Sequence, residues 1–138
     1  MLFFISSVLC YDIWFYVSHV LLHKRWFYAF HSEHHTKLNP TWLDTYVGHA
    51  LEGPFQGVGM LLPCLLLPYA WLDLLFALLF VNARGMMRHD ERFVWLIGNH
   101  HLLHHLYPQY NFGEYWIDAA MGTCYPVAAE YRKGLIYL

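Results

Sequence analysis

Apolar and polar segments alternate along the 138-residue chain, and the apolar ones are long. Residues 1–22 carry one formal charge, Asp12, and a helix needs about 20 apolar residues to cross a bilayer. Residues 54–83 are apolar again, but two full crossings would need about 40 residues. The segments 24–53 and 84–138 are mixed in polarity. The pattern predicts an all-α integral membrane protein with one transmembrane helix over residues 1–22.

The second apolar segment is interrupted by Pro63 and Pro68. Proline removes an intrahelical hydrogen bond and kinks the chain. A single straight crossing would place the histidines that follow residue 84 on the opposite side from those that precede residue 54. We therefore expect a short or re-entrant helical hairpin bent near the two prolines. Basic residues flank both of its ends, which predicts that a polar cap on this side faces the cytosol.

Composition narrows the class of protein. The chain is 58% hydrophobic, against about 45–50% in soluble domains, and only 13% of its residues are charged. A net charge of −2 gives no basic field, so nucleic acid is not expected as a partner. The three cysteines form no C-x-x-C pair and predict no thiolate metal site. Residues 1–22 lack a basic leader and a cleavage site, so we expect a retained anchor within a single domain of residues 1–138.

Eleven histidines are the chemical anomaly, and most of them lie in groups with helical spacing. Residues three or four apart share one face of a helix, so each group can converge on a small volume. Neutral imidazole binds zinc, copper, iron and nickel. Together with His89, the grouped histidines are enough for two metal ions, whereas a mononuclear zinc site needs three or four ligands. The groups are His19 and His23; His31, His34 and His35; and His101, His104 and His105.

Other residues around these groups have supporting roles in the prediction. We expect the carboxylates of Asp12, Glu33 and Asp90 to accept ring N–H groups from the ligands and so to fix their tautomers. His100 points about 100° away from its neighbour on a helix, which makes it a helper rather than a ligand. His49 stands alone and is more simply a polar core residue, although it remains an additional ligand candidate.

The three histidine groups resemble the histidine boxes of the fatty acid hydroxylase/sterol desaturase superfamily, in order and in spacing. The similarity runs from about residue 8 to residue 124. Within the superfamily the chain is most similar to sterol C5-desaturases. That closer likeness is carried by Gly48-His49-Ala50, Val81-Asn82 through His89-Asp90, His100-His101-x2-His104-His105-Leu106-Tyr107 and Tyr110-Asn111-Phe112-Gly113.

The resemblance implies a membrane-bound non-haem oxidase with two iron ions, for which zinc can substitute. Such an enzyme uses O2, and electrons from cytochrome b5 and its NAD(P)H-dependent reductase, to hydroxylate or desaturate a sterol or another lipid. The endoplasmic reticulum membrane is the expected location in a eukaryote. His49 and His100 also match family histidines but rank below the other ligands. The ligand positions that carry over are His19, His23, His31, His34, His35, His89, His101, His104 and His105.

Two departures from the family pattern leave an alternative open. Relatives usually have a further hydrophobic hairpin before the first box, whereas this chain starts about 18 residues ahead of it, as a fragment or a minimal version would. Many relatives also carry a histidine near the positions of Phe80 or Ala83, so this sequence depends on His89 alone there. The alternative is a non-catalytic membrane zinc protein or an inactive relative. Oxygen consumption with a reductant and a lipid distinguishes the two hypotheses.

Overall fold

The structure, a computed structural model, describes residues 1–136, and over this range it contains helices and no strand. The expected all-α fold is confirmed. The α-helices are α1 (Leu2–Leu22), α2 (Glu52–Gly57), α3 (Trp71–Arg88), α4 (Val94–Ile97), α5 (His100–Leu106) and α6 (Tyr115–Met121). The 3-10 helices are η1 (Tyr28–Phe30), η2 (His34–Thr36), η3 (Trp42–Tyr46), η4 (Val58–Leu65), η5 (Glu91–Phe93) and η6 (Ala128–Glu130).

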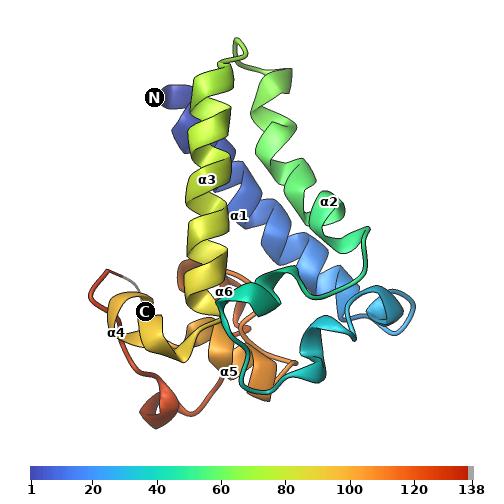
Figure 1. The fold of residues 1–138 in the computed structure, drawn as a ribbon, viewed down its shortest axis with the longest axis vertical. Coiled ribbons are helices and arrows are strands. Elements are labelled where there is room, and N and C mark those ends of the chain that lie inside the picture. Colours follow the sequence, from blue (N-terminus) through green and yellow to red (C-terminus); the bar gives the residue numbers. More distant parts are fainter. Residues whose placement is uncertain (137–138) are drawn as a thin grey trace.

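The apolar stretch between the two polar segments forms a helical hairpin, as expected. α2 continues into η4, the chain turns over residues 66–70, and α3 returns alongside (Figure 1). Pro63 lies inside η4 and Pro68 lies in the turn. α1 packs against both limbs of the hairpin. The short helices and loops of the remaining chain gather at the end opposite the turn, so the two polar segments form one cap (Figure 1).

The long helix α1 buries polar residues and exposes apolar ones. Ser7, Asp12 and His19 are buried, and the exposed apolar side chains repeat every three or four residues. η4 and α3 also expose large apolar side chains. By length and composition, α1 is the one helix of the described chain that qualifies for crossing a membrane. The exposed apolar residues of α1 are Leu2, Ile5, Leu9, Ile13, Val17 and Leu21.

A buried network of ion pairs joins α1, α3 and the residue before α6. Asp12 of α1 accepts hydrogen bonds from both terminal nitrogens of Arg84 on α3. Arg88, one turn further along α3, pairs with Glu114. The expectation that Asp12 supports a histidine is therefore wrong, because a buried carboxylate without a cation is costly and α3 brings a guanidinium to it. The network fixes α1 against α3 at Asp12, seven residues before His19, the first cluster histidine on α1.

The segment around the second histidine group is less regular than its spacing suggests. His31 to Glu33 form turns, the three-residue helix η2 follows from His34, and no α-helix forms here. Most side chains between residues 32 and 39 are exposed. Helical stability in proteins comes largely from packing of an apolar face, which this segment lacks. The expectation of a regular helix face at this group was wrong.

Candidate metal centre

Nine histidines converge in two adjacent clusters within the cap. In each cluster every residue offers one ring nitrogen, and these nitrogens all lie within 4.8 Å of one another. The two clusters contain all nine residues expected as ligands. The five-histidine cluster is His19, His23, His31, His35 and His104; the four-histidine cluster is His34, His89, His101 and His105.

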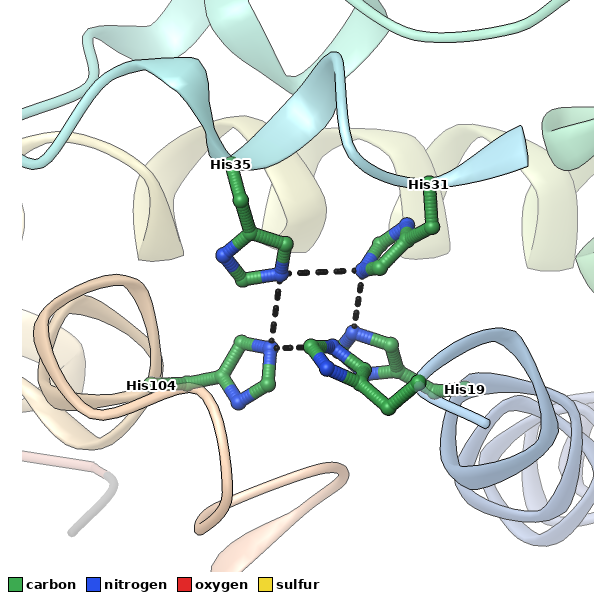
Figure 2. Close-up of side chains that lie close together, drawn as sticks. His19, His31, His35 and His104 are labelled. Atoms are coloured by element: carbon green, nitrogen blue, oxygen red, sulfur yellow. Dashed lines mark hydrogen bonds between the residues drawn. The ribbon is translucent and has the colours of Figure 1, made fainter. Parts of the chain in front are cut away.

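Each histidine trio is divided between the two clusters. Residues four apart stay together, as in the pairs His31/His35 and His101/His105, while the third member joins the other cluster. Neighbours such as His104 and His105 point about 100° apart on a helix, so they join different clusters. Figure 2 shows His31 and His35 from one segment facing His19 of α1 and His104 of α5. The expectation that one trio converges on a single volume is corrected to a shared, two-site arrangement.

Backbone carbonyls fix the tautomers of four cluster histidines. A carbonyl oxygen can only accept a hydrogen bond, so the ring nitrogen that contacts it must carry the proton. In all four, this nitrogen is Nδ1, which leaves the lone pair on Nε2. The Nδ1 to oxygen distances are 2.5 Å for His19 to Phe112, 2.6 Å for His104 to Tyr110, 2.9 Å for His34 to Val47 and 2.7 Å for His89 to Gly85.

The Nε2 atoms of His34 and His89 lie 3.0 Å apart with their lone pairs facing each other. No proton is available for a hydrogen bond between them, because both rings donate from Nδ1 to carbonyls. Such a pair repels unless both nitrogens bind the same cation. In the five-histidine cluster, Nε2 of His19 and His31 are 2.9 Å apart, and those of His104 and His35 are 3.1 Å apart. The donor sets therefore fit metal ions in both clusters.

Burial keeps the imidazoles in the neutral form that binds metals. Removal from water disfavours the charged form and lowers the pKa of His23 to about 4. The same cause lowers the pKa of His35 and of His89 to about 3. A ring nitrogen of His105 is buried without a hydrogen-bond partner. An orphaned nitrogen in a dry site costs free energy, and coordination to a metal would offset that cost.

The one carboxylate that the described hydrogen bonds bring to a cluster histidine was missed by sequence reasoning. Glu52 Oε1 lies 2.8 Å from Nδ1 of His31, and burial raises the pKa of Glu52 to about 8. The expectation for Glu33 and Asp90 was wrong: Glu33 is exposed, and Asp90 pairs with Arg92. Both follow a histidine closely in sequence, but their side chains point elsewhere. Glu52 is 21 residues from its partner, so no spacing rule identifies it.

The two lower-ranked histidines lie outside both clusters. His100 Nε2 is 3.0 Å from Asp118 Oδ2. Asp118 also accepts from the backbone N–H groups of Phe112 and Gly113, so it holds the loop whose carbonyls bond to cluster rings. His49 is exposed and packs against a ring on the protein surface.

A cavity of about 280 Å³ opens next to both clusters. Its polar wall includes His19 and His31 from one cluster and His34, His89 and His101 from the other. Side chains of α1, η4 and α3 form the apolar part of the lining. These apolar residues are Phe15, Met60, Leu78 and Val81. A substrate in this cavity would contact the ligand histidines of both clusters.

The described chain is all-α and places two adjacent histidine clusters, each able to hold a metal ion, beside a shared, partly apolar cavity. The sequence model of the fatty acid hydroxylase family matches residues 4–123, and the chain belongs to this family. Enzymes of the family are histidine-rich, metal-dependent oxidoreductases. Neither a curated protein nor a solved structure matches the chain.

Proposed function

We propose that the chain is a membrane-bound, O2-dependent oxidoreductase that hydroxylates or desaturates a lipid at two histidine-held iron ions. The unprotonated Nε2 atoms of His34 and His89, 3.0 Å apart, carry the proposal, because their repulsion is relieved when both bind one cation. Family membership supplies the reaction class. When bound, a pair of iron ions would supply the redox chemistry that an unactivated C–H bond requires and that side chains lack.

The protein's own residues orient the ligand rings and shield the site from water. Nε2 of His19 and of His104 face the five-histidine cluster because the carbonyls of residues 110–113 hold the opposite side of each ring. Val47 and Gly85 do the same for the four-histidine cluster. The apolar side of the cavity excludes water and suits a hydrocarbon segment of a substrate. The target C–H bond would lie against the wall formed by both clusters.

The number of donors in the five-histidine cluster favours iron over structural zinc. A structural zinc site takes four ligands, whereas this cluster offers five ring nitrogens within 4.8 Å of one another. This donor set supports a redox-active centre over the alternative of a zinc store.

The exposed apolar surface supports a membrane location. α1, η4 and α3 expose large apolar side chains along their lengths, whereas monomeric soluble proteins rarely expose large contiguous apolar patches. We propose that these helices contact lipid and that the cap lies at the cytosolic surface, where cytochrome b5 or another reductant delivers electrons. The likeness to sterol C5-desaturases makes a sterol the first substrate to test, and the endoplasmic reticulum the first compartment.

The test is O2-dependent product formation by the purified, iron-loaded protein. With a reductant and a lipid mixture, we expect oxygen consumption together with a hydroxylated or desaturated product detected by mass spectrometry. His104→Ala should abolish product because it removes a donor from the five-histidine cluster, while the four-histidine cluster keeps its iron. His49→Ala is the matched control, since His49 is exposed and outside both clusters.

One further experiment tests the sterol substrate separately from the oxidase activity. Expression in a yeast strain without its own sterol desaturase, followed by sterol and fatty-acid profiling, would give a C5-desaturated sterol if the closer likeness holds. A different lipid product would keep the oxidase and reject the sterol. A protein that binds metal but consumes no oxygen with any lipid would instead support the non-catalytic alternative.

A further inference from the structure

Glu52, the first residue of α2, is the carboxylate that the described hydrogen bonds bring to a cluster histidine. Its Oε1 lies 2.8 Å from Nδ1 of His31, and the side chain is almost fully buried. In the described hydrogen bonds the other anchored cluster rings bond to backbone carbonyls, which are neutral. Burial favours the neutral acid in the metal-free protein, but a metal ion on Nε2 of His31 would leave the ring proton on Nδ1 and favour the carboxylate as its acceptor. The five-histidine cluster would then have an anionic partner, and the described hydrogen bonds give the four-histidine cluster no equivalent.

The chain leaves space for this carboxylate. A Cβ atom added at Gly48 would lie 2.6 Å from Glu52 Oε2, so a larger residue there would push the carboxylate away. Gly48 also has a φ of +155°, a backbone conformation that residues with a side chain rarely adopt. Oε2 itself is buried and has no protein partner, so its position is not explained by another hydrogen bond. The space at Gly48 therefore allows the Glu52 carboxylate to contact His31.

We propose that Glu52 is the positioning residue of the five-histidine cluster. Its carboxylate holds His31 as the Nδ1–H tautomer, with Nε2 directed at His19 and His35, which lie 2.9 and 3.0 Å away. A carboxylate partner also makes imidazole a more basic ligand, and such partners typically change metal affinity 10- to 100-fold. The two metal sites are consequently unequal. The inference rests on the proposed two-metal centre, but it does not depend on the reaction.

Cobalt titration of the purified protein in detergent tests the proposal. Co²⁺ reports binding through its visible absorption and needs neither O2 nor lipid. We expect two Co²⁺ ions in the wild type and, in Glu52→Ala, a 10- to 100-fold loss of affinity at one site with the other unchanged. Glu52→Gln should lose less, because its amide oxygen can still accept from His31 Nδ1. Glu33→Gln is the matched control, since it removes the same charge from an exposed position between the ligands.

Three results would overturn the assignment: Glu52→Ala with wild-type affinity at both sites, Glu52→Ala with equal losses at both sites, or Glu33→Gln with the same loss as Glu52→Ala. If Glu52→Ala does not fold, Glu52→Gln decides through the reduction potential of the iron-loaded protein. That potential should become more positive, because the lost charge stabilises the more oxidised metal. An unchanged potential rejects the role. A wild type that binds two Co²⁺ unequally but oxidises no lipid would retain the assignment and reject the proposed function.

Discussion

Asp12→Asn is expected to destabilise the fold without removing a metal ligand. Asp12 and Arg84 are each 4% exposed, and both carboxylate oxygens contact the guanidinium. Removing one partner of a buried ion pair typically costs 3–5 kcal/mol, because the other charge stays buried. Glu114 Oε1 lies 3.3 Å from Arg84 and remains as a counter-ion. The expected cost is therefore at the lower end, about 3 kcal/mol.

The assay is thermal unfolding in detergent, followed by size-exclusion chromatography of the heated protein. For a chain of this size a loss of 1 kcal/mol lowers Tm by roughly 3–5 °C, so Asp12→Asn should unfold roughly 10 °C below the wild type. Below its Tm the variant should retain both metal ions. Asp73→Asn is the control, because Asp73 also connects α3 to α1, through the backbone N–H of Phe4, but is partly exposed. Its shift should be clearly smaller.

A double-mutant cycle with Arg84→Met separates the ion pair from its surroundings. If the pair is the cause, Asp12→Asn combined with Arg84→Met should be more stable than the sum of the single losses by at least about 1 kcal/mol. Additive losses, or a Tm for Asp12→Asn equal to that of Asp73→Asn, would refute the reasoning. A selective loss of metal with unchanged Tm would instead restore the expectation that Asp12 supports a ligand.

Three further outcomes follow from the site and its loops. His34→Ala should lower bound iron from two ions to about one per chain, whereas His35→Ala should lose less because four donors remain in its cluster; elemental analysis measures both. Asp118→Asn should loosen the loop at 110–113 and speed the release of iron to a chelator, by about tenfold. The ion pair with Lys37 lowers the pKa of Asp44 to about 2, below about 3.9 in the unfolded chain. Its stabilising contribution is therefore full above about pH 4 and is lost as the pH falls toward 2. The Tm difference between wild type and Asp44→Asn should close over that range.

The sequence predicted the parts of the site that local spacing controls. Residues four apart share a helix face, and three such pairs, His19/His23, His31/His35 and His101/His105, each share a cluster in the structure. The length of residues 54–83 and its prolines predicted the hairpin that brings His101 to His34. Both inferences depend on geometry within one segment, and the length and residue spacing of that segment can be read from the sequence.

The rest depends on contacts between distant segments. That His34 and His104 join different clusters from their neighbours follows from how three segments meet, which spacing alone does not encode. Glu52 reaches His31 across 21 residues, and carbonyl partners such as Phe112 O carry no side-chain signal at all. Asp12 was expected to support a ligand histidine, but it pairs instead with Arg84, which α3 brings to it from 72 residues away in the sequence.

Mössbauer spectroscopy of the chain loaded anaerobically with ⁵⁷Fe²⁺ tests the central claim, that the nine histidines form two iron sites. The account predicts two ferrous ions per chain with two distinguishable quadrupole doublets, because five nitrogens surround one site and four surround the other. His34→Ala should lose one doublet and keep the other. One iron per chain in the wild type, or the loss of both doublets together in folded His34→Ala, would contradict the two-site arrangement.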